Sequence, residues 1–458
     1  MNEKKLKILF VLRSYGHLPT FRRSIQILAQ RGHTVFILLY KNLTAESLEE
    51  IRALEKRFDN VHYDWTVPSA RGGTIVFHVR ELFTYRKHLL TSGDHQFYAL
   101  RWKKYIHPKL QYICAWRIAR VVLKMKLAGW ILKTVERLTP PQEDVIHHIT
   151  AIRPDVILAT PVNQRYSSME LEYLKAAVAL GIPSLLPTGS WDHITSKGAY
   201  HAIPDRFLVW NEKQVKELFL HNGVSPARVR IVGALTMDHW LDPPELSPRG
   251  VFCTRYGLRS EDPILLYCCS SSVASKNETW LVAELRKILD ESDDRRLRKT
   301  QIILRPHPQN FQVYGNLDMK GVSVIPRGEP FHGKEEGQKI FYDTLYHSTA
   351  VAGINTSAML DAVIMGKPVI ALYRDSYADI QVEMHHFKSL LEEHVVDLVK
   401  TPEETRNAIR DILEGKDKRK EYRERFIKEY LRPRGLAVSA GESVANEVED
   451  IAKMGYSK

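Results

Sequence analysis

Two cationic side chains stand on a proline-locked segment, "IILRPHPQN" (302–310), which follows an apolar run. Pro306 and Pro308 fix the backbone on both sides of His307 and remove two backbone donors. Arg305 and His307 could together neutralise an anion, so we predict His307 as a catalytic residue and Arg305 as a ligand-binding one. The alternative is a rigid turn in which His307 only satisfies local hydrogen bonds.

A polar turn and then a helix are predicted in "GINTSAMLDAVIMGKPVIAL" (353–372). Thr356 or Ser357 could cap this helix, whose first backbone N–H groups and positive dipole end would bind a phosphate. We therefore predict Asn355, Thr356 and Ser357 as binding residues. Asp361, one turn into the helix, could accept hydrogen bonds from a ribose. An ordinary capped helix with a solvated Asp361 is the alternative.

Two further polar clusters follow predicted strands. Ser270 and Ser271 belong to "CCSSS" (268–272), and their hydroxyls could reach bound phosphates. The loop "PTGSWDHITSKGAYHAIPD" (187–205) is rich in functional groups, which is typical of a cleft wall. The predicted substrate-positioning residues on this loop are Trp191, Asp192, His193 and Lys197. A purely structural loop is the alternative.

The elements that must position these residues begin with a βαβ unit. Strands are predicted at 6–12 and 34–40, and the apolar spacing of 21–33 predicts a helix between them. Such a unit requires a parallel sheet with a right-handed crossover. The first half of the chain continues in the same α/β style, with further strands predicted at 154–160, 182–189, 206–211 and 228–234.

The pattern restarts after the polar, proline-rich stretch "LDPPELSPRG" (241–250). The second half contains a predicted helix at 277–292 and predicted strands at 263–271, 300–307, 322–326, 349–355 and 367–373. The predicted fold class is therefore α/β, with two Rossmann-like doubly wound domains that face each other across a ligand-binding cleft. The expected segments are an N-terminal domain (1–240), a linker (241–260), a C-terminal domain (261–432) and a C-terminal helix that returns to the N-terminal domain (433–458).

Composition supports a globular protein with an anionic partner. The 458 residues are 44% hydrophobic and 26% charged, and the formal net charge is +12. The four cysteines lack paired metal-ligand spacing, so we expect neither a metal site nor disulfides. No signal-peptide core and no membrane-spanning stretch are recognisable, which favours a cytoplasmic location.

The second half resembles GT-B glycosyltransferases. Its Ser/Thr turn, the acidic Asp361 and the later Gly-x-Pro at 366–368 are similar to the donor-nucleotide motif of this family, which includes the N-acetylglucosaminyltransferase that forms lipid II. Family members usually carry Glu where this chain has Asp361. The opening "YGHLPTF" (15–21) resembles the loop on which the family places a histidine beside the acceptor, and His17 matches that histidine. The second half also resembles CDP-glycerol glycerophosphotransferases of the cell envelope.

The resemblance implies transfer of a sugar from a nucleotide-activated donor to a hydroxyl acceptor, lipid-linked or polysaccharide, in cell-envelope synthesis. Inverting transfer needs a base, and we assign that role to His17. The leaving diphosphate needs fixed donors, which the helix start and the Arg305/His307 pair would supply. No Asp-x-Asp closes an apolar strand, so we expect a metal-independent reaction without a cofactor. A glycerophosphotransferase, a UDP-sugar 2-epimerase and a non-catalytic two-domain binding protein remain alternatives.

The segment 95–138 is basic and aromatic. It holds three tryptophans and a single acid, Glu136, and its basic residues are Arg101, Lys103, Lys104, Lys109, Arg117, Arg120, Lys124, Lys126, Lys133 and Arg137. A basic amphipathic helix of this composition fits an anionic membrane surface, which would place the protein on the inner face of the membrane. A helix packed on the N-terminal domain is equally consistent. A nucleic-acid site is disfavoured because no RNA- or DNA-binding motif accompanies the segment.

Overall fold

The structure is a computed structural model. It describes residues 4–40, 45–68, 74–91, 97–104, 106–160, 162, 169–272, 274–328 and 335–455. The chain forms two compact units. Unit 1 comprises residues 1–238 together with 430–458, and unit 2 comprises residues 239–429.

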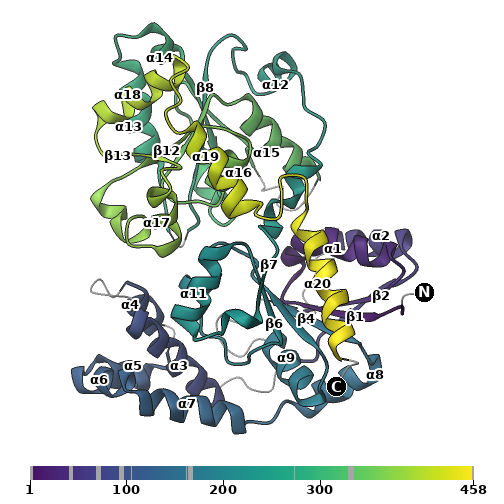
Figure 1. The fold of residues 1–458 in the computed structure, drawn as a ribbon. Coiled ribbons are helices and arrows are strands. Elements are labelled where there is room, and N and C mark those ends of the chain that lie inside the picture. Colours follow the sequence, from purple (N-terminus) through teal and green to yellow (C-terminus); the bar gives the residue numbers. More distant parts are fainter. Residues whose placement is uncertain are drawn as a thin grey trace. The chain divides into compact units, whose positions relative to one another are not determined.

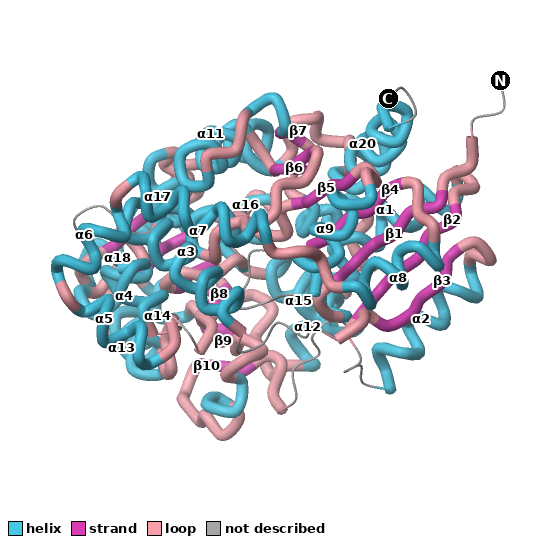
Figure 2. The backbone as a smooth tube through the Cα atoms, turned by 90° about the horizontal axis from the view of Figure 1, so that it is seen from below, coloured by secondary structure: helices cyan, strands magenta, loops and turns pink. Residues whose placement is uncertain are grey.

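Unit 1 contains a seven-stranded sheet in which every neighbouring pair of strands is parallel. Figure 2 shows its strands side by side in the order β3-β2-β1-β4-β5-β6-β7. Their bounds are β1 (Lys7–Leu12), β2 (Thr34–Leu39), β3 (Val61–Trp65), β4 (Val156–Thr160), β5 (Ser184–Pro187), β6 (Arg206–Val209) and β7 (Val229–Ile231). The order reverses between β1 and β4, as in a Rossmann-like doubly wound sheet.

Strand β1 is apolar along its whole length because both of its faces are covered. Ile8 and Phe10 belong to one core cluster, together with residues of the first and last helices. Leu9 and Val11 belong to a second cluster on the opposite face. Side chains alternate between the faces of a strand, so a continuous apolar run is what a parallel strand buried on both sides requires.

The helices of unit 1 cover both faces of this sheet. They are α1 (Leu18–Gln30), α2 (Ala45–Arg57), α3 (Ile75–Thr91), α4 (Phe97–Lys103), α5 (Pro108–Ala115), α6 (Arg117–Lys124), α7 (Lys126–Leu138), α8 (Glu143–Ile152), α9 (Met169–Leu180), α10 (His193–Ser196), α11 (Glu212–Asn222) and α20 (Ala440–Gly455). In Figure 1 the yellow α20 lies beside the purple α1. The Asp238 carboxylate accepts hydrogen bonds from the backbone N–H groups of Ala440 (2.9 Å) and Gly441 (2.7 Å), which fixes the start of α20 on unit 1.

Unit 2 contains a second parallel sheet, in the order β10-β9-β8-β11-β12-β13. The strands are β8 (Ile264–Cys268), β9 (Gln301–Arg305), β10 (Val322–Val324), β11 (Ala350–Gly353), β12 (Val369–Leu372) and β13 (Asp397–Val399). The order reverses between β8 and β11. A Cβ atom on Gly353 would lie 2.7 Å from the Cys268 carbonyl oxygen, so only glycine allows these two strand ends to approach.

The helices of unit 2 are α12 (Arg249–Arg255), α13 (Thr279–Asp290), α14 (Arg295–Lys299), α15 (Glu335–His347), α16 (Ala358–Ile364), α17 (His385–Glu392), α18 (Pro402–Leu413) and α19 (Lys420–Phe426). Both units are thus Rossmann-like and doubly wound, which confirms the predicted fold class. Among the described residues, no helix combines the length and apolarity needed to cross a bilayer.

Two expectations about segments are corrected. The expected linker, 241–260, belongs to unit 2 and contains α12, where Phe252 and Cys253 are buried. The prolines of this stretch precede a helix that packs into a core. The segment 95–138 contains four short helices, α4 to α7, instead of one, and extended backbone at Trp116 and Met125 separates α5, α6 and α7. Residues 95, 96 and 105 lie outside the described part.

Candidate functional site

Three adjacent strands of unit 2 carry the predicted binding residues at their carboxyl ends. In the sheet register Cys268 of β8 pairs with Arg305 of β9 on one side and with Gly353 of β11 on the other. The segments 268–272, 305–307 and 355–357 therefore leave the sheet at one edge, at the point where the strand order reverses. Open α/β sheets bind ligands outside this point.

Arg305 places a cation at this edge. Its guanidinium lies over the ring of Phe341 on α15, at 4.2 Å from the ring centroid. The Nη1 atom is inaccessible to solvent and has no hydrogen-bond partner among the described residues. Burial lowers the pKa of Arg305, while the nearby Cys268 and Asp361 raise it. A buried guanidinium nitrogen without a partner is costly, and a bound anion would satisfy it.

Asp361 is buried near Arg305 and contacts two aromatic residues that the sequence analysis missed. The Trp240 indole N–H donates to Asp361 Oδ1 at 2.8 Å, and His239 Nε2 lies 3.8 Å from the same oxygen. Burial raises the pKa of Asp361, and His239, Trp240 and Arg305 each lower it. The ribose contact predicted for Asp361 stays a prediction, and Oδ1 already has Trp240 as its donor. The sequence signal for these two residues was "DHW" (238–240). It was not assigned to the site, because the N-terminal domain was predicted to end at residue 240.

His307 is held by the turn that its prolines form. The Gln309 backbone N–H donates to His307 Nδ1 at 3.1 Å, so the ring proton of the neutral form lies on Nε2. Asn310, three residues on, donates from Nδ2 to the carbonyl oxygens of Ser270 and Ser275, at 3.2 Å in both cases. The turn after β9 is therefore tied to the loop after β8, which fixes the position of the imidazole.

The remaining predicted ligands of this edge differ in access. Ser270 is fully buried, and its backbone N–H donates to Glu278 at 2.9 Å. Asn355 donates to the Ile380 carbonyl and so anchors the segment after β12. Thr356 Oγ1 accepts from the Ala358 N–H at 3.4 Å, whereas Ser357 is exposed at the helix start and its side chain makes no capping bond. Ser271 is partly buried.

His17 occupies the equivalent edge of unit 1. It lies in the short 3₁₀ turn that follows β1, beside β4, where the strand order reverses. The ring Nδ1 is 3.0 Å from Ser14 Oγ. Burial and the charge of Arg13 lower the pKa of His17 to about 4, against a smaller raising effect of Ser14. The imidazole is thus neutral at pH 7 and can accept a proton.

The loop after β5 places Ser190, Ser196 and the predicted Lys197 around the carboxylate of the predicted Asp192. Its carboxylate accepts from Ser190 Oγ at 2.7 Å and from Ser196 Oγ at 2.6 Å, and Lys197 Nζ lies 3.3 Å from it. His193 is almost fully buried, and burial lowers its pKa to about 4, although Asp192 raises it. Trp191 is also buried. Asp192 therefore organises the loop internally.

A second group on unit 1 escaped the sequence analysis. Arg13 follows β1, Tyr40 follows β2, and Glu170 lies in the first turn of α9, the helix after β4, and β2, β1 and β4 are neighbours in the sheet. Burial and the charge of Glu170 raise the pKa of Tyr40 to about 12, while Arg13 lowers it. Glu170 is fully buried. Only the sheet order unites these residues, which are up to 157 positions apart in the numbering.

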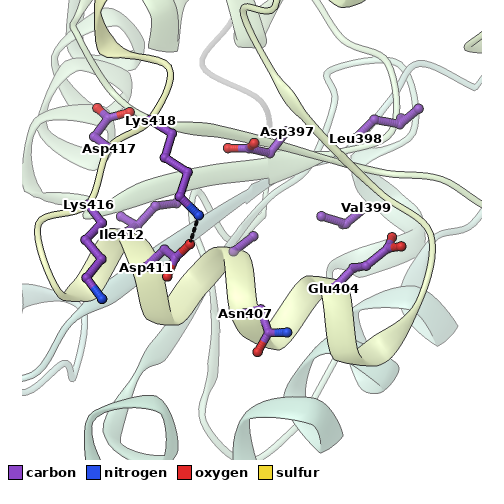
Figure 3. A pocket seen from close by; sticks show the side chains of 11 residues that line it. Asp397, Leu398, Val399, Glu404, Asn407, Asp411, Ile412, Lys416, Asp417 and Lys418 are labelled. Atoms are coloured by element: carbon purple, nitrogen blue, oxygen red, sulfur yellow. Dashed lines mark hydrogen bonds and ion pairs between the residues drawn. The ribbon is translucent and has the colours of Figure 1, made fainter.

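Two hollows in the structure lie away from these strand ends. A cavity of about 640 Å³ in unit 1 is lined by residues of α3, α7 and α9 and by segments that precede β6 and β7, so it adjoins the opposite edge of the sheet. A pocket of about 260 Å³ in unit 2 lies beside α18 (Figure 3). Four acidic side chains and two lysines line it, and Lys418 forms an ion pair with Asp411.

Comparison with known proteins rests on structure. No protein-family model matches the sequence, and no curated protein is similar to it in sequence. The chain is similar to the UDP co-structure of S. aureus MnaA (TM-score 0.56, 11% identity, covering 98% of this chain and 97% of that one). It is similar to UDP-GlcNAc 2-epimerase from Neisseria meningitidis bound to UDP-GlcNAc (TM-score 0.54, 10% identity, covering 96% of this chain and 99% of that one). It is also similar to a glycosyltransferase from Rickettsia africae (TM-score 0.54, 12% identity, covering 98% of this chain and 99% of that one).

The chain has the GT-B fold. These similarities extend over nearly the whole chain and include both sheets, which confirms the fold that the sequence resemblance implied. At 10–12% identity they concern the fold alone. Epimerases and a glycosyltransferase share this architecture, so the chemistry has to be argued from the residues of each unit.

Proposed function

We propose that this protein is an enzyme that binds a nucleotide-diphosphate sugar through unit 2. The observation that carries the proposal is Arg305, whose buried and unbonded Nη1 lies at the reversal point of the unit 2 sheet. His307 stands two residues away on a fixed turn, and the polar segment 355–357 follows the next strand but one. The Arg305 guanidinium supplies a positive charge and the His307 Nε2–H supplies a hydrogen-bond donor, and both suit the oxygens of a diphosphate.

Glycosyl transfer is the reaction that we propose first, in synthesis of a cell-envelope or surface polysaccharide. An acceptor hydroxyl attacks the anomeric carbon, the bond between that carbon and the diphosphate oxygen breaks, and the configuration inverts. His17 takes the hydroxyl proton, because its imidazole is neutral at pH 7, although a pKa of about 4 makes it a weaker base than an exposed histidine. Arg305 and His307 stabilise the charge that develops on the departing diphosphate, without a metal ion or a cofactor.

Epimerisation at C2 of a UDP-sugar is the second candidate. The group formed by Arg13, Tyr40 and Glu170 favours it, because such a reaction needs a carboxylate or another base for a carbon-bound proton. UDP-GlcNAc 2-epimerases are also among the proteins to which the chain is structurally similar. Glu170 would be the added carboxylate that distinguishes this chemistry from transfer.

Incubation with UDP-GlcNAc separates the two reactions. NMR spectroscopy and mass spectrometry of the products would show the manno epimer of the sugar nucleotide if the protein is an epimerase. Release of UDP that requires an added lipid-linked or polysaccharide acceptor would show transfer. CDP-glycerol as a parallel substrate tests the glycerophosphotransferase alternative. If the protein binds neither UDP nor CDP and turns over none of these substrates, it is a non-catalytic protein and the proposal is wrong.

Substitution of His307 tests its role at the diphosphate. We expect His307→Ala to lower the affinity for UDP about 10- to 100-fold, because interactions with charged groups contribute about 1.5–3 kcal/mol. The affinity for uridine should not change, since the nucleoside lacks the phosphates. Calorimetric titration measures both, with exposed His62→Ala as the matched control. An unchanged UDP affinity together with a lowered melting temperature would show that His307 is only a structural pin.

A further inference from the structure

The helices α5, α6 and α7 expose an unusual share of the apolar surface. Eleven of the 26 exposed large hydrophobic side chains among the described residues lie within 112–138. They are Tyr112, Ile113, Trp116, Ile118, Val121, Val122, Met125, Leu127, Trp130, Ile131 and Leu138. We call this set of residues the apolar face. Exposed apolar side chains in this number on three consecutive helices mark an interaction site.

The helical spacing gives α6 and α7 two distinct sides. Ile118, Val121, Val122 and Met125 recur at intervals of three and four residues along α6, so they share one side of it. Leu127, Trp130, Ile131 and Leu138 do the same along α7. Both rows are 47–76% exposed.

The opposite side of α7 packs against unit 1. Gly129 and Glu136 are buried, and a Cβ atom on Gly129 would lie 2.6 Å from the Arg86 guanidinium of α3. Arg80 of α3 binds Glu136 with two nitrogen atoms, at 2.8 and 2.9 Å. The helix α7 is thus packed against α3, which lies beside it in Figure 1, while its apolar row stays exposed to solvent.

Charge identifies the occupant of this face. Within 112–138 the basic side chains are Arg117, Arg120, Lys124, Lys126, Lys133 and Arg137, and the single acid is Glu136. Glu136 is buried and paired with Arg80 and Lys175, so it contributes no negative charge at the surface. Helices that lie in the interface of an anionic bilayer typically combine lysine and arginine with exposed tryptophan and aliphatic side chains.

We propose that α5, α6 and α7 dock this protein on an anionic lipid bilayer, with the rows of α6 and α7 entering the boundary between headgroups and acyl chains. A phosphate backbone would meet the cations but leave the eleven apolar side chains in water. A second copy of this face would bring like charges together. Only a surface that is both apolar and anionic satisfies both sets of side chains.

Vesicle flotation of the full chain tests the proposal. We expect binding to phosphatidylcholine vesicles that contain about one third phosphatidylglycerol, and much weaker binding to phosphatidylcholine alone or at high salt. Ile118→Glu/Leu127→Glu should lower the partition coefficient at least about tenfold, because two inserted side chains become anionic. The matched control, Val251→Glu/Leu436→Glu, also replaces two exposed apolar residues and should bind as the unchanged protein does.

Two results would overturn the proposal. One is equal binding of the two double variants, which would mean that this face does not touch lipid. The other is a protein that stays off anionic vesicles but self-associates in light scattering and becomes monomeric in Ile118→Glu/Leu127→Glu, which would assign the face to a second copy. Neither readout depends on catalysis, so the test is independent of the proposed function.

Discussion

His17→Gln should lower turnover about 10²- to 10⁴-fold while leaving UDP affinity unchanged, since general base catalysis typically contributes a factor of that size. The neutral imidazole takes the acceptor proton, whereas the glutamine amide cannot. Because the pKa of His17 is about 4, the rate of the unchanged protein should be flat near neutral pH and should fall as the pH decreases through that value. Steady-state kinetics across pH measures both effects.

The control for His17 is His147→Gln, which replaces an exposed histidine on α8. It should retain full turnover. Near-normal kinetics of His17→Gln would show that the Ser14 contact makes His17 a structural residue of the turn, and the base would then have to be sought elsewhere. If epimerisation is the reaction observed, Glu170→Gln becomes the decisive variant and His17→Gln should retain most of the activity.

Arg80→Met should destabilise unit 1 by about 3–5 kcal/mol, the usual cost of removing one partner from a buried ion pair. Arg80 is 2% exposed and binds Glu136 and, at 2.8 Å, Glu172, so its removal takes an ion-pair partner from each of two buried carboxylates. Urea denaturation followed by tryptophan fluorescence measures the loss. Six of the eight tryptophans belong to unit 1, so the signal reports chiefly on its unfolding.

The pH dependence of this stability has a defined sign. Burial alone would raise the pKa of Glu136, but hydrogen bonds and charge from Arg80 outweigh it and hold the pKa below its ordinary value. A carboxyl with a lowered pKa stabilises the fold above its unfolded pKa, and this contribution is lost as the pH falls. Arg80→Lys, which keeps the charge but loses the two-nitrogen contact, should lose less stability than Arg80→Met. Equal stability of Arg80→Met and the exposed control Arg52→Met would contradict the account.

The central strands were predictable because their pattern is local. A strand covered on both faces reads as a continuous apolar run, as in β1 and β8. The edge strands β3 and β13 were missed, because "VHYDW" (61–65) alternates with polar residues and "DLV" (397–399) is short. The breaks that divide 95–138 at Trp116 and Met125 carry no glycine or proline to announce them.

The residues of the candidate sites also divide into those that a local sequence pattern predicts and those that only the fold brings together. Arg305, His307 and the 355–357 turn were recognisable because each follows an apolar run directly. His239 and Trp240, which contact Asp361, were not recognisable. They lie more than 100 residues earlier in the sequence, and only the fold brings them to Asp361. Sheet order also assembles Arg13, Tyr40 and Glu170, and no local pattern in the sequence encodes that order.

Calorimetric titration of UDP into the unchanged protein and into Arg305→Met tests the central claim most directly. The account predicts that the unchanged protein binds UDP and that Arg305→Met binds it about 10- to 100-fold more weakly, because the variant loses a charged partner of the diphosphate. Arg295→Met, which replaces an exposed arginine of α14 in the same unit, should bind UDP normally. An Arg305→Met variant with unchanged UDP affinity, or an unchanged protein that binds neither UDP nor CDP, would contradict the account.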